Sequence, residues 1–371
     1  MDKNTRKTSF GKWLNAIDFE KFNEIVTIHG QDRYTKKLTT QAYTLLMLYA
    51  QLMESDSLHA LEAALTNRDF QRAIGVDSIS VSQLSRKNNR LDPTVLSNLF
   101  MQLVSQIAVQ KLSPKKGLLL KIIDSTTIPL NVNHFKWAEF RETKAGVKLH
   151  IRLVFDENGT HYPDKEVITN AKEHDRNQLE VLVDDKEAMY VFDRGYVDYE
   201  RFDRFTDDGL FFVCRLKKNA VLHPIHTFSL PEGSDALSDT MAFVGANPNC
   251  TENVFRILVI PDGKGGELRL ITNRFDISAE EISEIYRSRW AIELFFKWLK
   301  QHVKIKHFYG QSEYAVKNQI YLALIAYCLN VLIQSETNSR KSILAISRIL
   351  AANLWESSRY WLRRIRSGSI P

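Results

Sequence analysis

The stretch EIYRSRWAIELFFKWLKQHVK, residues 284–304, decides how the rest of the chain is interpreted. Its apolar residues recur too densely for an alternating strand, and no Gly or Pro interrupts it, so the pattern predicts one continuous helix. The preceding segment Ile277-Ser-Ala-Glu-Glu supplies the capping box with which such a helix begins.

Four residues of this stretch, Tyr286, Arg289, Glu293 and Lys300, would share one face of the helix. Their offsets of 3, 7 and 14 residues, at about 100° per residue, keep them within roughly 60° of one another. A solvated face with helical ion pairs is the ordinary explanation of such a cluster. Because aromatic residues surround these positions, we instead expect Glu293 at the edge of a core, where a carboxylate usually meets a cation or a metal ion.

Composition limits the possible classes of protein. The chain has 371 residues, 44% hydrophobic and 11% aromatic, enough for two or three folded domains. Its 50 Lys and Arg against 44 Asp and Glu give a net charge of +6, which suits a polyanionic partner without requiring one. Its three widely separated cysteines are typical of reduced thiols. The N-terminus is polar, and the longest apolar run, residues 320–333, is too short to span a membrane. Together they predict a cytoplasmic protein without a membrane segment.

Residues 1–112 are predicted to be helical throughout, with apolar periodicity over 10–25, 42–53, 58–65 and 95–109. Within them, residues 68–91 resemble a helix, a Gly-containing turn and a second helix. That second helix carries side chains of the kinds that contact phosphates and base edges: Gln83, Arg86, Lys87 and Arg90. They are candidates for DNA binding, although a solvated helix would show the same pattern.

After Pro114 the pattern changes to short strands. An apolar run at 117–124 predicts a buried strand that ends in Asp124, and 147–169 alternates on both sides of a turn, as an antiparallel hairpin does. There follow a helix at 175–184, a strand at 189–192 that ends in Asp193, a helix at 198–205 and a strand at 210–216. This succession, closed by the long helix with Glu293, is that of a ribonuclease-H-like α/β sheet.

In such a sheet the ends of the first and fourth strands lie side by side and the late helix packs across them, which brings Asp124, Asp193 and Glu293 to one place. Three crowded carboxylates repel one another unless divalent cations neutralise them. All-oxygen ligands favour Mg²⁺ or Mn²⁺, and two ions about 4 Å apart would activate a water or 3′-hydroxyl in phosphodiester chemistry. Each acid alone is a weak signal, since a strand-end Asp is commonly a turn residue.

The spacing Tyr286-x-x-Arg289-x-x-x-Glu293, with Lys300 seven residues further on, resembles the Y-R-E-K signature of bacterial insertion-sequence transposases of the DDE class, in the insertion-sequence family numbered four. The segment Asp193-Arg-Gly-Tyr resembles the family's block around its second acid, and Ile123-Asp-Ser-Thr the block around its first. The resemblance covers about residues 115–335 well and the N-terminal region loosely.

The resemblance implies roles for individual residues. The catalytic acids, which would hold two Mg²⁺ ions with Mn²⁺ as a substitute, are Asp124, Asp193 and Glu293. The side chains that bind phosphates beside the cleavage site are Tyr286, Arg289 and Lys300. In such transposases a 3′-hydroxyl attacks the opposite strand to form a hairpin at the transposon end, and the excised end then joins target DNA. The partners implied are double-stranded transposon ends and target DNA, bound by a homodimer in the DNA complex.

Residues 217–272 fall outside the basic sheet and resemble the β-rich insertion of such enzymes. Hairpin-forming members stack a flipped base on an aromatic residue there; Phe228, Phe243 and Phe255 are candidates, with core packing as the alternative. Beyond the signature, Lys304 and Lys306 are candidate phosphate contacts or else part of a solvated surface. The basic tail could bind DNA or form a dimer contact, and the sequence leaves both open.

We therefore expect an α/β protein in which a ribonuclease-H-like catalytic domain, interrupted by a β-rich insertion, follows an all-helical N-terminal domain. The expected segments are a DNA-binding domain at 1–112, the catalytic domain at 113–335 and a basic helical tail at 336–371. The expected function is DNA transposition in a bacterial cytoplasm, with metal-dependent strand cleavage, hairpin formation and strand transfer. The alternatives are a catalytically silent, transposase-derived DNA-binding protein, which loss of an acid would have favoured, and a stand-alone nuclease, which leaves Tyr286 and Lys300 unexplained.

Overall fold

The structure is a computed structural model that describes residues 7–111, 119–155, 161–302 and 308–366. Contacts divide the chain into two compact units. The helical unit consists of Met1–Pro114, Pro129–Gly146 and Lys297–Pro371, and the sheet unit of Lys115–Ile128 and Val147–Phe296. The predicted N-terminal domain and the basic tail therefore belong to one unit, together with residues 297–335.

The N-terminal part of the helical unit is a succession of helices, as predicted: α1 (Ser9–Trp13), η2 (Leu14–Ala16), α2 (Phe19–Ile28), α3 (Thr40–Leu52), α4 (Leu58–Ala64), α5 (Arg68–Ile74), α6 (Val81–Arg90) and α7 (Pro93–Lys111). The apolar periodicity predicted over 10–25 is divided between α1, η2 and α2. The Asp18 carboxylate accepts hydrogen bonds from the N–H groups of Glu20 and Lys21, and this cap starts α2 as a separate helix.

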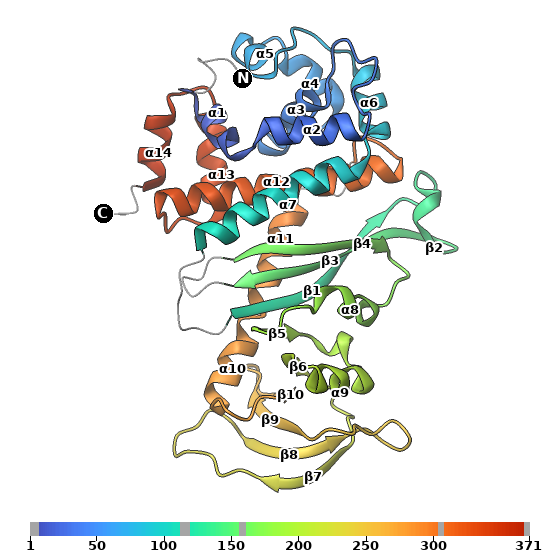
Figure 1. The fold of residues 1–371 in the computed structure, drawn as a ribbon, viewed down its shortest axis with the longest axis vertical. Helices are drawn as coiled ribbons and strands as arrows, with labels where there is room; N and C mark the ends of the chain where they lie inside the picture. Colours follow the sequence, from blue (N-terminus) through green and yellow to red (C-terminus); the bar gives the residue numbers. More distant parts are fainter. Residues whose placement is uncertain (1–6, 112–118, 156–160, 303–307, 367–371) are drawn as a thin grey trace. The chain divides into compact units, whose positions relative to one another are not determined.

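The long helix α12 (Glu313–Thr337) contacts α3, α6, α7 and α13 (Ile343–Ala352), and α14 (Ser358–Arg366) ends the described chain (Figure 1). Polar residues of α12 have buried partners: Asn330 accepts a hydrogen bond from the Trp13 indole at 2.9 Å, and Asn318 donates one to the Leu91 carbonyl at 2.8 Å. By length and composition α12 could cross a membrane, but 89% of its apolar window is buried inside the protein. It is the core helix of its unit.

The strands are β1 (Leu119–Leu130), β2 (Glu139–Arg141), β3 (Lys144–Phe155), β4 (His161–Asn170), β5 (Ala188–Phe192), β6 (Phe211–Arg215), β7 (Leu222–Thr227), β8 (Ser238–Val244), β9 (Phe255–Pro261) and β10 (Glu267–Thr272). They form one ten-stranded sheet in the order β2-β3-β1-β5-β6-β10-β9-β8-β7, with β4 paired to β3. β1, β5 and β6 are parallel, whereas β3 and β4 form the predicted antiparallel hairpin. The turn of this hairpin, 156–160, lies outside the described residues.

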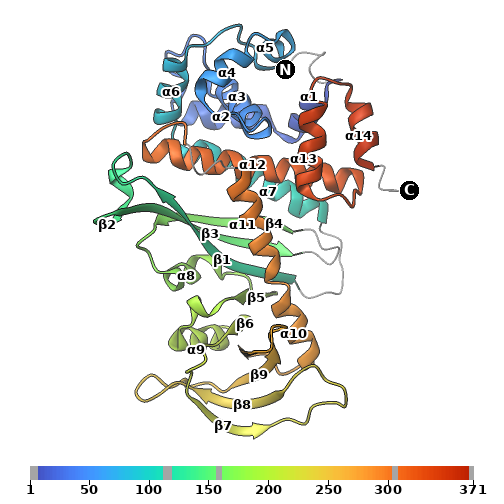
Figure 2. The same cartoon turned by 180° about the vertical axis from the view of Figure 1, so that it is seen from behind.

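The predicted insertion continues this sheet. β10 pairs antiparallel with both β6 and β9, and β8 and β7 extend the sheet to its edge (Figure 2). The expectation that residues 217–272 lie outside the basic sheet is therefore wrong. The physical reason is that β6 would otherwise leave a row of unpaired backbone groups, which β10 satisfies.

Short helices connect the strands: η3 (Lys136–Ala138), η4 (Asp175–Gln178), α8 (Leu179–Leu182), η5 (Arg194–Tyr196) and α9 (Tyr199–Asp207). α9 lies on one side of β6 and α10 (Ala279–Arg287) on the other (Figure 1). Phe202 of α9 packs on Phe212 of β6 with ring centres 4.5 Å apart. Because helices cover both faces of the central strands, every residue of β5 is buried.

The signature stretch forms two helices, α10 and α11 (Trp290–His302), so the expectation of one continuous helix is wrong. The predicted capping box is confirmed at Ser278. The break has a local cause: the Ser288 hydroxyl donates a hydrogen bond to the Ile285 carbonyl at 2.6 Å and competes with the helical ladder. The N–H of Arg289 then bonds the Tyr286 carbonyl in a tighter turn, at 3.1 Å.

Candidate active site

Asp124 and Asp193 are brought together by strand register. β1 and β5 pair in parallel as far as Ile123 with Phe192, and the two aspartates are the next residues along each chain. β5 ends there, but β1 continues to Leu130, so the expectation that Asp124 ends its strand is wrong. β1 continues because its other neighbour in the sheet is β3. Both carboxylates still lie at the carboxyl end of the parallel pairing, where open α/β sheets bind ligands.

Arg289, in the turn between α10 and α11, joins two of the acids. Its Nη1 lies 3.4 Å from Oδ2 of Asp124, and its Nη2 lies 2.5 Å from Oε1 of Glu293. Tyr286, on the last turn of α10, donates its hydroxyl to Oδ1 of Asp193 at 3.4 Å. The structure thus brings together the three predicted acids and two of the three predicted phosphate-binding side chains.

The Asp124 carboxyl is an unusually weak acid. Burial raises its pKa from 3.8 to about 6. The Ser125 N–H, which donates to Oδ1 at 2.8 Å, and the charge of Arg289 oppose this rise, whereas Asp193 and Asp175 add to it. In the absence of a cation, the ionised form of Asp124 therefore costs folding free energy.

This cost predicts a pH-dependent effect of replacing Asp124 by Asn. At about pH 2 to 3 both folded and unfolded Asp124 are mostly protonated, so the substitution changes little. As the pH rises toward 6 the unfolded state ionises first, and the wild type loses stability that the variant retains. We expect metal-free Asp124→Asn to be more stable by about 1–3 kcal/mol at pH 8, measured by urea unfolding with a chelator. A stability difference that does not change with pH would contradict this.

Tyr286 and Arg289 both remain protonated. Burial raises the pKa of the Tyr286 phenol well above its ordinary value, and Asp193 adds to the rise. For Arg289, burial favours the neutral form, but Tyr286, Glu293 and both aspartates outweigh it and raise the pKa. The guanidinium carbon lies 6.0 Å from the Tyr286 ring centre. Both side chains can therefore donate hydrogen bonds to a carboxylate or to a phosphate.

Within the described parts of the chain, no three His, Cys, Asp or Glu side chains are grouped closely enough to hold a metal ion together. The donor chemistry fits a hard divalent cation all the same, because all three acids offer carboxylate oxygens. The guanidinium of Arg289 supplies positive charge between Asp124 and Glu293. A metal ion shared by these two acids would therefore require Arg289 to leave at least one of them.

A fourth carboxylate, that of Asp175 at the start of η4, was not predicted. Its Oδ1 accepts a hydrogen bond from Ser125 Oγ at 2.5 Å, and Lys148 Nζ lies 3.3 Å from the same atom. Nδ1 of the fully buried His150 lies 3.6 Å away. Burial lowers the pKa of His150 to about 4, so this imidazole is neutral at pH 7. Through Ser125, Asp175 anchors the residue whose N–H donates to Asp124.

The remaining lysines of the prediction lie apart from this cluster or outside the described residues. Lys300 is exposed on α11, seven residues beyond Glu293, which is about 10 Å along a helix. Lys304 and Lys306 lie outside the described residues.

The predicted helix, Gly turn and helix at 68–91 are confirmed as α5, Gly75 at φ 76° and α6. Two of the four candidate side chains, Arg86 and Arg90, are exposed. The other two have structural partners. Gln83 completes the capping box of α6, and Lys87 Nζ lies 2.8 Å from Oδ1 of Asp32 with its side chain only 11% exposed.

A cavity of about 340 Å³ lies between the insertion and the start of α10. Phe228 and Phe275 line it, together with Arg256, whose guanidinium carbon is 5.8 Å from the Phe228 ring centre. Of the other aromatic candidates for base stacking, Phe255 is fully buried and Phe243 does not line this cavity. Phe228 is therefore the candidate whose surroundings suit a base.

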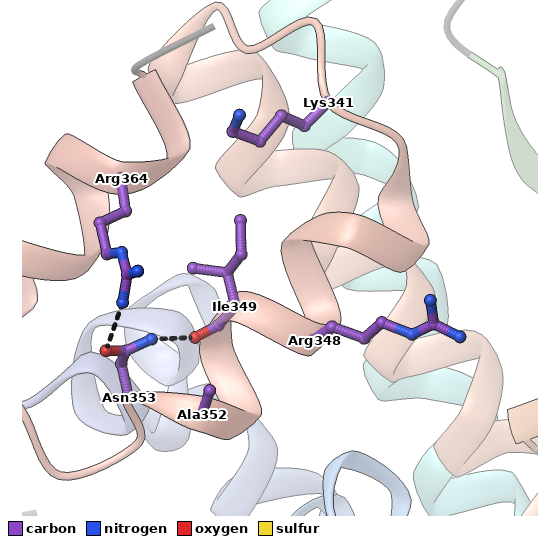
Figure 3. Close-up of a pocket in the computed structure, with 6 residues that line it drawn as sticks. All are labelled: Lys341, Arg348, Ile349, Ala352, Asn353 and Arg364. Carbon is purple, nitrogen blue, oxygen red and sulfur yellow. Dashed lines mark hydrogen bonds between the residues drawn. The ribbon is translucent and has the colours of Figure 1, made fainter. Parts of the chain in front are cut away.

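A second cavity, of about 390 Å³, lies among the C-terminal helices (Figure 3). The cationic side chains of Lys341, Arg348 and Arg364 line it together with apolar Ile349. Asn353 orients one of these cations: its side-chain oxygen accepts a hydrogen bond from Arg364 at 3.3 Å, while its amide donates to the Ile349 carbonyl at 2.7 Å. Cations beside an apolar surface suit a sugar phosphate.

Two carboxylates just beyond the parallel pairing of adjacent strands in an α/β sheet offer oxygen ligands that suit divalent cations. Residues 115–329 match the family model described as a transposase DDE domain. The match spans more than half of the 371 residues, and the chain belongs to this family of DDE transposases. Residues 5–76 match a second model, described only as a domain of unknown function.

The relatives of the chain are also named as transposases. Over 318 residues it is 28% identical to one for insertion sequence element IS5377 from Geobacillus stearothermophilus, covering 85% of this chain and 80% of the relative. It is 30% identical to transposase y4zB of Sinorhizobium fredii, covering 66% of this chain and 69% of the relative. It is 25% identical to one for insertion sequence element IS4SA from Synechocystis, covering 78% and 82%.

Proposed function

We propose that this transposase cuts and joins DNA strands at one site formed by Asp124, Asp193 and Glu293. The register of β1 and β5, which places two carboxylates on adjacent strands, carries the proposal. The strand order β4-β3-β1-β5-β6, with β3 and β4 antiparallel and the last three parallel, supports a ribonuclease-H-like catalytic domain interrupted by an insertion, β7 to β10.

The three acids would hold Mg²⁺, as one or two ions, with Mn²⁺ as a substitute. Bound there, the ions would activate a water or 3′-hydroxyl and stabilise the departing oxygen. The protein's own part is to place the DNA. Arg289 would leave the acids for a phosphate, to which it can donate two parallel hydrogen bonds, while Tyr286 adds one donor and Lys300 a point charge. DNA binding would thereby free Asp124 and Glu293 for the metal.

Hairpin formation requires the end of the transposon to be distorted, and the cavity beside Phe228 and Phe275 supports such a step. A base flipped out of the duplex could stack on these rings. α10 leads from Glu280, which lines the cavity, to Tyr286 beside Asp193, a rise of about 9 Å for six helical residues. A base held in the cavity would therefore leave neighbouring phosphates within reach of the acids.

The other parts of the chain would bind and assemble DNA. Residues 1–112 would recognise the transposon end, chiefly through Arg86 and Arg90, and residues 336–371 would hold a further phosphate in the cavity of Figure 3. A homodimer would bring two ends together and join them to target DNA. These events would take place in the bacterial cytoplasm, at the nucleoid.

Replacing Arg86 and Arg90 together by Ala should weaken binding to the transposon end. Each exposed cation that neutralises a phosphate releases counterions, so we expect the log–log salt slope to flatten by roughly one to two units. Fluorescence anisotropy at several salt concentrations measures this. Lys87→Ala should instead lower thermal stability, because it leaves the Asp32 carboxylate without the cation 2.8 Å away. An unchanged slope in the double variant would move end recognition to another surface.

Incubating the protein with linear DNA that carries its coding region and both flanks tests the proposed function. We expect Mg²⁺-dependent release of a fragment with hairpin ends. The alternative of a catalytically silent DNA-binding protein draws support from the pairing of Arg289 with two of the acids. It predicts that the flanks are bound and never cut.

A further inference from the structure

The connection between α2 and α3, residues 29–38, lies beside α6, and we call it the basic loop (Figure 1). Beyond the end of α6, the Gln31 side chain accepts a hydrogen bond from the Asp92 N–H at 3.2 Å. In the last turn of the helix, Asp32 pairs with Lys87. These contacts fix the first half of the loop.

The second half is fixed at the other end of the helix. Lys37 Nζ donates a hydrogen bond at 2.8 Å to the hydroxyl of Ser78, which precedes the start of α6. The basic loop is therefore held at both ends of α6. A lysine that served only to contact DNA would be exposed, but the Lys87 side chain is only 11% exposed. It acts as a positioning residue that holds the loop against the helix.

The loop and the helix together expose a cationic surface. The exposed cations are Arg33, Lys36 and Lys37 of the loop and Arg86 and Arg90 of α6. Asp32 is the only acid in residues 29–38, and Lys87 neutralises it. Protein interfaces are depleted of charge at their centres, whereas a surface of closely spaced cations matches the phosphates of DNA.

An exposed aromatic side chain stands at the tip of the loop. Tyr34 is 88% exposed, and its φ of 64° lies in the left-handed region, where a non-glycine residue costs roughly 1–2 kcal/mol. The Arg33 guanidinium carbon lies 5.2 Å from its ring centre. The backbone of Tyr34 is therefore strained, and its aromatic ring is exposed to solvent beside the Arg33 cation.

We propose that the basic loop is a second DNA-contact element beside α6, in which Arg33 and Lys36 contact phosphates and Tyr34 reaches into the groove next to the one that α6 enters. Arginine and inserted side chains are the usual means of binding the minor groove. The inference rests on the proposed role of α6 in end binding. It assigns a ligand, double-stranded DNA, to part of the segment that matches a domain of unknown function.

The variant Tyr34→Gly distinguishes a DNA-binding role of Tyr34 from a structural role. A structural role predicts a lower melting temperature, whereas a DNA-binding role predicts weaker DNA binding without a loss of stability. Glycine adopts φ 64° without strain, so the melting temperature should stay the same or rise. Affinity for duplexes taken from the DNA that flanks the coding region should nevertheless fall about tenfold, the scale of one lost aromatic contact to a base. Tyr34→Trp, which keeps a stacking ring, should retain most of the affinity.

The cations of the loop are tested with Arg33→Ala and Lys36→Ala combined, which should flatten the salt slope by about one to two units. Lys21→Ala is the matched control, because Lys21 is an exposed cation of α2 outside the loop, with its side chain 69% exposed. Its slope should equal that of the wild type.

The outcomes distinguish the two levels of the proposal. Failure of the wild type to bind any flanking duplex more tightly than a duplex of random sequence would overturn the role of α6 in end binding. End binding that is intact in the wild type and unchanged in both Tyr34→Gly and the double variant would overturn the inference about the basic loop alone.

Discussion

Replacing Asp193 by Asn abolishes strand cleavage while leaving DNA binding nearly intact: this is the result that we expect. Asparagine has the size of aspartate, and its carbonyl oxygen can still accept the Tyr286 hydroxyl, so the packing around β5 is preserved. The substitution removes the negative charge that a divalent cation needs. Cleavage should fall at least about 10³-fold, the scale of losing a main transition-state interaction. A time course with an end-labelled flanking duplex and Mg²⁺, beside a gel-shift assay, measures both properties.

Asp208→Asn provides the matched control for this experiment. Asp208 is exposed at the end of α9, outside the carboxylate cluster of the same unit, so its variant should cut DNA like the wild type. Substantial Mg²⁺-dependent cleavage by Asp193→Asn, or equal losses in both variants, would contradict the assignment of Asp193.

Replacing Arg289 by Ala should change metal binding and catalysis in opposite directions. Without DNA the guanidinium lies beside Asp124 and Glu293 and competes with a cation for them. Its removal should therefore tighten Mn²⁺ binding, by about tenfold if the competition amounts to 1.4 kcal/mol. Cleavage should still fall by roughly 10²- to 10³-fold, because the phosphate loses the bidentate hydrogen bonds from the guanidinium. Calorimetric titration with Mn²⁺ at pH 8 and the cleavage time course give the two quantities.

Arg287→Ala is the control for Arg289→Ala. Arg287 is an exposed arginine on the last turn of α10, 3.7 Å from Asp235, and its loss should alter neither quantity. If Arg289→Ala bound Mn²⁺ more weakly than the wild type, Arg289 would be organising the acids rather than competing with the metal, and the proposed coupling between DNA and metal would be wrong.

The order of strands and the position of Asp193 could be predicted because they depend on local patterns. A short apolar run bounded by a polar residue marks a buried strand, and alternation on both sides of a turn marks a hairpin. The break between α10 and α11 could not be predicted in this way. No Gly or Pro marks it, and the hydrogen bond from Ser288 to the Ile285 carbonyl depends on a side-chain rotamer that the sequence does not specify.

The pattern of charged residues in β3 indicates that acidic partners lie near it. Lys148, His150 and Arg152 alternate along β3 and so point to one face of a strand that is otherwise buried. Buried cations and imidazoles need acidic or polar partners. Asp175 lies beside Lys148 and His150 in a short helix beyond the next strand, whereas Arg152 pairs with Asp164 and Asp184. Only the tertiary fold identifies these partners.

Crystals of the protein with a flanking duplex and Mn²⁺ would test most directly whether the three acids form one metal-dependent site. Anomalous scattering locates Mn²⁺ independently of the protein coordinates. We predict an anomalous peak within coordination distance, about 2–2.3 Å, of oxygens from Asp124 and Asp193, with Glu293 as a further ligand and Arg289 moved onto a phosphate. An absence of Mn²⁺ from these acids, in crystals whose protein cuts the same DNA in solution, would contradict the account.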